Sequence, residues 1–210
     1  MEKGNHDNNQ VTLKGRVAEE PVFSHSLYGE KFFTLMLEVP RLSGIADVLP
    51  VMVSDRLLRL MDVSVGDELA VLGQLRSYNR MVDGRNRLIL TVFARHISPP
   101  EDVADNPNQV LLEGFVCRTP VYRTTPFGRE ITDLLIAVNR PYNKSDYIPV
   151  ISWGRNARYA ETLEVGQKVF IHGRMQSRQY QKKLTDGTAE NRTAYEVSVS
   201  FIEMPEVPEY

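Results

Sequence analysis

The sequence predicts an all-β chain made of two tandem copies of one small barrel. The first observation is an internal repeat: residues 10–51 align with residues 109–150 without a gap, and fourteen aligned positions keep the same residue. The second is that apolar and polar residues alternate at period two in several segments, as half-buried strands require. Each copy has the size of a small domain with its own core, whereas solenoid repeats run to roughly 20–50 residues.

Strands open each copy. Residues 11–17 alternate apolar and polar side chains, and Gly15 in mid-strand indicates a bulge or a sharp coil. A turn with Pro21 and Gly29 should follow. The second and third strands are expected at residues 33–39 and 48–53 in the first copy, and at 132–138 and 147–153 in the second.

The period then changes. Residues 54–61 begin with a capping Ser54 and present one apolar face, so they predict a short helix, as do residues 156–163 in the second copy. A fourth strand, a hairpin loop with a strong Asp-Gly turn signal and a fifth strand should complete each copy. These strands are expected at residues 68–78 and 87–97 in the first copy, and at 168–180 and 193–202 in the second. Five strands with one helix between the third and fourth is the order of an OB-fold, a small Greek-key barrel.

Composition predicts the domain boundaries. One OB-fold should occupy residues 1–98 and the other residues 109–203. Residues 99–108 between them are polar and rich in proline, as a stiff linker would be. Residues 204–210, with two prolines and no strand pattern, are expected to form a tail.

Overall charge and cysteine content exclude several classes of protein. The 210 residues are 42% hydrophobic and 25% charged with a formal net charge of −2, so a site for nucleic acid must be a local basic groove. The single cysteine, Cys117, excludes an intrachain disulfide and fits a reducing compartment. No apolar run has the length of a membrane span, and residues 1–10 lack the apolar core of a signal peptide, so the cytoplasm is the expected location.

Arrangements typical of enzymes are missing. The four histidines, His6, His25, His96 and His172, are far apart and show no ligand spacing with Cys117 or with carboxylates. The sequence has no phosphate-binding loop that ends in Lys-Ser/Thr and no nucleophile elbow. We therefore expect a protein that is not an enzyme and that has no metal and no cofactor.

Four segments of the second copy carry a family resemblance. They are residues 137–142, 146–154, 173–180 and 195–199, and their order and spacing extend over nearly all of residues 108–203. Together they resemble the bacterial single-stranded DNA-binding protein family, and the first copy enters mainly through its repeat with the second. The resemblance implies a tandem OB-fold version of that family, which binds and protects single-stranded DNA in replication, recombination or repair with little sequence preference.

The family stacks DNA bases on four aromatic positions, and all four are aromatic here. By the resemblance they are Tyr142, Tyr147, Trp153 and Tyr180. Flat side chains stack on bases, while neighbouring cations neutralise the phosphates of the strand. The expected phosphate contacts are basic residues near these aromatics in the sequence: Arg140, Arg155, Arg174, Arg178, Lys182 and Lys183.

The first copy lacks all four stacking residues. The aligned positions hold Ser43, Val48, Ser54 and Arg80. We therefore interpret it as an OB-fold that is degenerate in stacking aromatics, with weaker stacking or with a shifted site. The further candidates for contacts are Tyr78, Arg80, Arg85 and Arg87 in this copy, and Tyr122 and Phe127 beside a turn in the second.

The resemblance also implies partners. The simple form of the family is a tetramer of one-domain chains, so a two-domain chain should form a homodimer that presents four OB-folds, in the cytoplasm and associated with the nucleoid. Replication or repair proteins are implied partners as well, although residues 203–210 lack the acidic run of the family's tail. Two alternatives stay open. The ligand could be RNA, because stacking does not distinguish ribose from deoxyribose. The chain could also be an OB-fold assembly or interaction protein of primosome-accessory type, with weak or secondary nucleic-acid binding.

Overall fold

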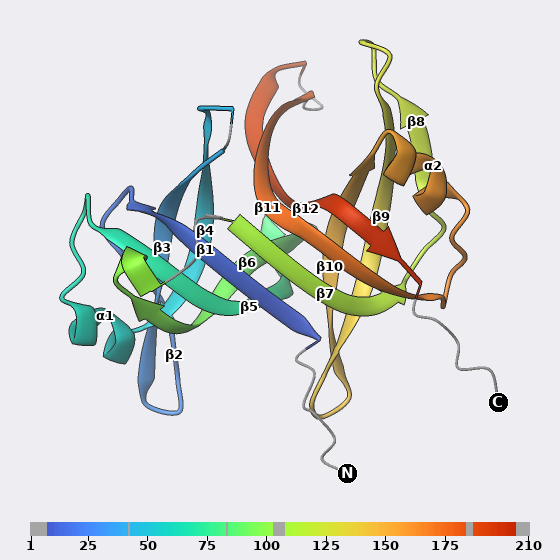
Figure 1. Ribbon diagram of the computed structural model, residues 1–210. Helices are drawn as coiled ribbons and strands as arrows, with labels where there is room; N and C mark the ends of the chain where they lie inside the picture. The colour runs from blue at the N-terminus through green and yellow to red at the C-terminus, as the bar shows by residue number, and fades with distance from the viewer. Residues whose placement is uncertain (1–7, 42, 83, 103–107, 184–186, 205–210) are drawn as a thin grey trace.

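The computed structural model describes residues 8–41, 43–82, 84–102, 108–183 and 187–204, and most of these residues lie in strands (Figure 1). The first copy contains β1 (Asn9–Val17), β2 (Val22–Leu27), β3 (Glu30–Pro40), β4 (Ala46–Ser54), α1 (Asp55–Met61), β5 (Glu68–Val82) and β6 (Arg85–Ser98). A short 3-10 helix, η1 (Pro100–Asp102), follows. The second copy contains β7 (Asn108–Val116), β8 (Val121–Thr124), β9 (Glu130–Arg140), β10 (Lys144–Trp153), α2 (Arg155–Glu161), β11 (Lys168–Lys183) and β12 (Ala189–Glu203).

Each copy closes into a five-stranded barrel. In the first copy, β1 pairs with β3 and β5, β4 pairs with β3, and β6 pairs with β5. A short parallel pairing between β4 and β6 completes the ring. The same five pairings recur in the second copy among β7, β9, β10, β11 and β12. The expected all-β class with two tandem OB-folds is therefore confirmed.

A further strand in each copy occupies the region where a turn was expected. Strand β2 pairs with β3 in one barrel, and β8 pairs with β9 in the other. Every residue of β2 is exposed, so this strand has no buried face and therefore no alternation that a sequence pattern could reveal. Both hairpins extend the barrel wall beyond its closed part.

Glycines allow the long strands to coil. The ladder between β5 and β6 shifts register at Gly73, and the ladder between β11 and β12 shifts at Gly173. A Cβ atom on Gly173 would lie 2.4 Å from the backbone oxygen of Ser198, and one on Gly15 would lie 2.4 Å from that of Glu38. At Gly15, where a bulge or a sharp coil was expected, the structure shows a close approach of two backbones in which no side chain fits.

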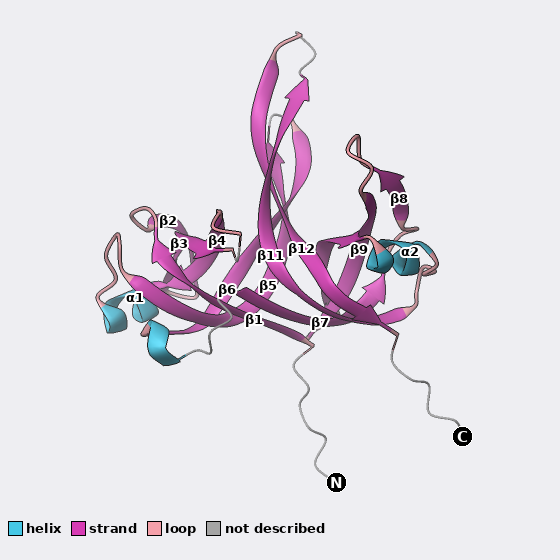
Figure 2. Cartoon of the chain, turned by 45° about the horizontal axis from the view of Figure 1, so that its top comes forward, coloured by secondary structure: helices cyan, strands magenta, loops and turns pink. Residues whose placement is uncertain are grey.

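The two barrels are joined edge to edge. Strand β1 pairs with β7 in antiparallel register, with Val11 opposite Val110, and this pairing links all twelve strands of the described residues into one sheet (Figure 2). Val11 and Val110 are both buried in a core that runs through both copies. Strand β6 ends at Ser98 and β7 begins at Asn108; residues 103–107 of the expected linker and 205–210 of the expected tail lie outside the described residues.

Candidate nucleic-acid interface

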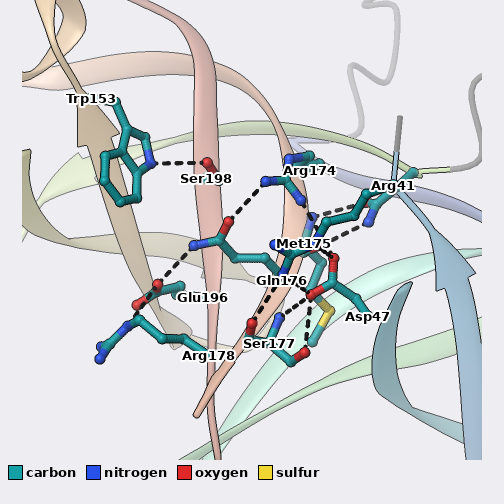
Figure 3. Close-up of polar contacts among 11 residues, drawn as sticks. Arg41, Asp47, Trp153, Arg174, Met175, Gln176, Ser177, Arg178, Glu196 and Ser198 are labelled. Carbon is teal, nitrogen blue, oxygen red and sulfur yellow. Dashed lines mark hydrogen bonds and ion pairs between the residues drawn. The ribbon is translucent and has the colours of Figure 1, made fainter. Parts of the chain in front are cut away.

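Two buried aspartates, equivalent in the repeat, fix the angle between the barrels. Asp47 on β4 accepts hydrogen bonds from the Nε of Arg41 at 2.6 Å and, across the junction, from the backbone N–H of Ser177 at 2.7 Å (Figure 3). The oxygen that accepts from the Nε of Arg41 also faces Arg174 of the second barrel at 3.4 Å. The carboxylate is fully buried, so its charge depends on these partners from both copies.

Asp146 on β10 repeats this arrangement in the opposite direction. It accepts the backbone N–H of Ser77 at 2.8 Å and faces Arg76 at 3.3 Å, both from the first barrel. Its own copy contributes Arg140 at 3.5 Å. Each barrel therefore contributes one aspartate that contacts a serine N–H and an arginine of the other barrel.

Arginine contacts determine the ionisation of the Asp47 carboxyl. Burial alone would raise its pKa, but the hydrogen bonds from Arg41 and Ser177 outweigh burial and lower the pKa below the ordinary value. Burial and the neighbouring Arg41 together lower the pKa of the Arg174 guanidinium. The junction is thus a closed ion-pair network in which Arg140 and Arg174, both expected to contact phosphate, already face carboxylates.

Tyr180 and Trp153 belong to one face of the second barrel. On β11, the guanidinium of Arg178 lies 5.7 Å from the centre of the Tyr180 ring. The same Arg178 faces Glu196 on β12 at 3.3 Å. Two residues farther along β12, Ser198 accepts a hydrogen bond from the indole N–H of Trp153 at 3.2 Å (Figure 3). Tyr180 is exposed and Trp153 half-buried, so one side of β10, β12 and β11 carries two aromatic rings around a charged centre.

Tyr147 and Tyr142 extend this set along β10 instead of closing it into a compact patch. Tyr147 alternates with the buried Asp146 and Ile148 and is 43% exposed, and its N–H donates to the Ser77 hydroxyl of the first barrel at 2.7 Å. Tyr142 lies in the turn between β9 and β10 and is 94% exposed. The turn and Trp153 stand at opposite ends of β10, roughly 30 Å apart at the usual rise per residue.

A cleft connects this face with the first barrel. It has a volume of about 750 Å³ and lies where the β5–β6 hairpin approaches the β11–β12 hairpin. Tyr180, Arg178 and Glu196 line it from the second barrel, and Arg87 lines it from the first. Figure 2 shows the two hairpins rising side by side from the shared sheet. The cleft therefore belongs to both copies.

Several cations of the cleft were missed by sequence reasoning. Arg192 on β12 stands directly opposite Tyr180 in the ladder, and Arg118 and Arg123 line the same cleft. Arg192 is equivalent to Arg87 of the first copy in the register of the two hairpins, but the hairpin loop of the second copy is longer, which hides this equivalence in the sequence. Arg123 forms an ion pair with Asp133 at 2.8 Å, so its charge is balanced locally.

The remaining predicted cations lie on two elements, α2 and the end of β11. Arg155 is exposed as the first residue of α2. Lys182 is on β11 beside Arg192, which is the largest cause of a lowered Lys182 pKa. Lys183 ends β11, and its side chain lies outside the described residues.

Tyr122 and Phe127 differ from each other. The Tyr122 hydroxyl donates to Glu130 at 2.7 Å, and this hydrogen bond raises the pKa of the phenol and lowers that of the carboxyl. Phe127, in the loop between β8 and β9, is 92% exposed. Phe127 is thus open for contact, whereas Tyr122 is committed to its strand partner.

The first barrel has its own cavity on the equivalent face. The cavity has a volume of about 730 Å³ and is lined by Phe23 and His25 of β2 and by Tyr78 and Arg80 of β5, among others. Phe23 is 54% exposed, and its ring meets Phe33 edge to face. The shifted candidates Tyr78 and Arg80 therefore share a cavity with an exposed aromatic residue, Phe23.

Within the described residues, no three side chains among histidine, cysteine, aspartate and glutamate come together as metal ligands would. No helix in that part of the chain is both long and apolar enough to cross a membrane.

Comparison with known proteins agrees with the geometry of the second barrel. The model of the single-strand binding protein family matches residues 107–205. Residues 107–205 are thus similar to the single-strand binding protein family. These residues contain the four aromatic positions and the face described above.

Curated relatives carry the same description. A single-stranded DNA-binding protein of Clostridium tetani is 36% identical over 39% of this chain and 59% of its own length. Single-stranded DNA-binding protein A of Bacillus subtilis is 31% identical over 36% of this chain and 50% of its own length. The chain spans roughly half the length of the curated relatives it matches, between 48% and 59% for the first three.

Solved structures extend the likeness in fold to both barrels. The wild-type single-stranded DNA binding protein from Thermus aquaticus superposes with a TM-score of 0.74 at 23% identity, and the match covers 96% of this chain and 95% of that one. The two-barrel arrangement is therefore a fold that a solved protein shares. The N-terminal domain of PriB protein from Thermoanaerobacter tencongensis is 55% identical over 44% of this chain, with a TM-score of 0.40.

Proposed function

We propose that this protein binds single-stranded DNA without catalysing a reaction, and that it protects the strand in replication, recombination or repair. The observation that carries the proposal is the outer face of the second barrel, where Trp153 and Tyr180 flank the Arg178–Glu196 pair. Exposed rings stack on bases of any sequence, and cations beside them neutralise the backbone. Little sequence preference follows, because every base has a flat face.

Tyr147 and Tyr142 support a path longer than one stacking pair. Tyr147 lies on β10 and Tyr142 in the turn before it, so the two continue the path from Trp153 to the other end of the strand, and both are exposed. An extended single strand could therefore place successive bases on the four rings, whereas a compact ligand could not. Arg155 and Lys182 are the cations that this proposal assigns to phosphate contacts, and Arg140 and Arg174 serve the junction first.

The working unit under this proposal is a homodimer with four OB-folds, in the cytoplasm and associated with the nucleoid. The pairing of β1 with β7 already joins two barrels within one chain, so two chains suffice. Replication or repair proteins would be its partners on the strand. RNA stays open as a second ligand because stacking does not read the sugar, and no described residue favours the primosome-accessory assembly alternative.

The test is a titration with oligo-dT in which binding is followed both by tryptophan fluorescence and by the anisotropy of a labelled oligonucleotide. Trp153→Ala should weaken binding by about 1–3 kcal/mol, the range for one stacked base. Trp153→Phe is the matched control, because it keeps a flat ring and should retain most of the affinity. Equal affinity of wild type and Trp153→Ala, or wild-type binding that does not depend on salt, would reject the proposal.

A further inference from the structure

We propose that the cleft between the β5–β6 and β11–β12 hairpins is a phosphate-binding bridge, through which one single strand passes from the second barrel onto the first. This inference rests on the proposed function and adds a site to it. Its ligand is the phosphodiester backbone, and its residues come from both copies. The strand would then be held by two barrels of one chain and not by the second barrel alone.

The first support is a pair of equivalent arginines. Arg80 pairs with Arg87 across the first hairpin, and Tyr180 pairs with Arg192 across the second. Arg87 and Arg192 are therefore structurally equivalent, and both line the same cleft. The fold brings one arginine from each copy to a single place, as a site shared by two copies requires.

The second support is an excess of positive charge. Five arginines line the cleft against two carboxylates, Asp133 and Glu196. Arg85 and Lys182 add charge from the two hairpins. The positive charges of Arg192, Arg85 and Arg87 lower the pKa of Lys182, so these arginines lie close to it. The ion pair of Arg192 with Glu190 does not cancel this field, since the pKa of Lys182 is lowered although Glu190 opposes the shift. A polyanion in the cleft would relieve the repulsion.

The third support is a connection to the first barrel. Like charges directly opposite each other on neighbouring strands are destabilising. Arg80 and Arg87 nevertheless stand opposite each other, Arg80 lining the cavity of the first barrel and Arg87 lining the cleft. Beyond Arg80 that cavity offers Phe23 and Tyr78, both exposed. The Arg80–Arg87 pair thus borders both the cavity and the cleft, and aromatic rings line both of them.

The experiment compares oligo-dT of two lengths by anisotropy over a range of salt concentrations. One OB-fold covers roughly 4–16 nucleotides, so about 8 nucleotides occupy one barrel and about 30 can reach both. The double variant Arg85→Gln with Arg87→Gln should bind the short oligonucleotide like wild type. For the long one, the slope of log affinity against log salt should become shallower by about 1.4, the value for two phosphates.

Two further variants make the result decisive. Arg56→Gln with Arg59→Gln removes the same charge from α1 of the same barrel, away from the cleft, and should leave both slopes unchanged. Arg85→Lys with Arg87→Lys keeps the charge and should restore the wild-type slope. Equal losses for both lengths, an unchanged slope for the long oligonucleotide, or the same loss in the α1 variant would overturn the bridge. Wild type that binds neither length would instead refute the proposed function itself.

Discussion

Asp47 shows how one side chain can link two domains. Its carboxylate is fully buried, yet it is contacted by Arg41 of its own barrel and by Ser177 and Arg174 of the other. A buried charge is tolerated only when such partners surround it, and removing one member leaves the others uncompensated. The geometry between the barrels, and with it the cleft, therefore depends on a few polar atoms.

Asp47→Asn should lower the free energy of unfolding by about 3 kcal/mol near pH 7, because two arginines lose their buried counter-charge. Because the folded-state pKa of Asp47 is lowered, its stabilisation is complete above the unfolded pKa of about 3.9 and is lost as pH falls through the folded value. The difference between wild type and variant should therefore shrink below about pH 4. Urea unfolding at a series of pH values measures it.

The control for this prediction is an exposed ion pair. Arg16 and Glu68 meet at 3.3 Å with both side chains more than half exposed, so Glu68→Gln should change stability by less than about 1 kcal/mol. If Asp47→Asn cost no more than this control, or if its cost were the same at pH 7 and pH 3, the junction would not depend on the buried carboxylate.

Among the elements, the long hairpin β11–β12 depends on a residue without a side chain. Gly173→Ala would place a Cβ atom 2.4 Å from the Ser198 oxygen at the register shift, so we expect a loss of about 1–3 kcal/mol from forced backbone movement. Gly29→Ala is the comparison, because Gly29 has open space and only a positive φ of 83°, which costs about 1 kcal/mol. Thermal unfolding of both variants would contradict this account if Gly29→Ala were the more damaging.

The strands that form the barrel walls could be predicted because each has one buried face. Strand β1 alternates buried and less buried residues from end to end, which is the pattern that period two predicts. Strand β2 could not be predicted, since all its residues are exposed. The joining of β1 to β7 was equally hidden, because edge pairing uses backbone groups that leave no mark on the side-chain pattern.

Only part of the candidate site could be predicted from the sequence, for the same reason. The four aromatic positions came from resemblance, and the structure places two of them on one face with Arg178. Arg192 stayed hidden because the hairpin loop lengthens in the second copy and breaks the constant offset of the repeat. Arg140 and Arg174 are basic in sequence, but a pattern cannot show that a buried aspartate already faces each of them.

On the scale of the whole molecule, the chain behaves as a dimer of barrels in one polypeptide whose halves have diverged. The equivalent positions are Gln74 and Arg174, and two residues later Arg76 and Gln176, so arginine and glutamine have exchanged places. Both aspartates still receive an arginine from across the junction, Asp47 from Arg174 and Asp146 from Arg76. The arginine–aspartate contact across the junction is therefore preserved although the arginine stands at a different position in each copy. A comparison of the two copies position by position would count this exchange as two lost arginines.

The outer side of the joined sheet carries apolar residues that favour pairing of two chains. Cross-strand register places Phe201 opposite His172 and His172 opposite Leu111, on the side away from the core residues Val110 and Ile171. The Phe201 and His172 rings meet at 5.9 Å, and Phe201 is 48% exposed. Leu72, the equivalent of His172 in the first barrel, is 41% exposed. A shared apolar face on a continuous sheet fits an interface between copies.

Phe201→Glu should therefore convert the proposed homodimer into single chains, because a two-fold interface would bury the new charge twice. Sedimentation equilibrium of wild type should give twice the chain mass of 23.9 kDa, and that of the variant should approach one chain mass. Leu60→Glu, at a more exposed apolar residue of α1, is the matched control and should leave the dimer intact. A wild-type mass of one chain, or dissociation of the control to the same degree, would remove this face as the interface, while binding of short oligonucleotides by the second barrel should persist in the dissociated variant.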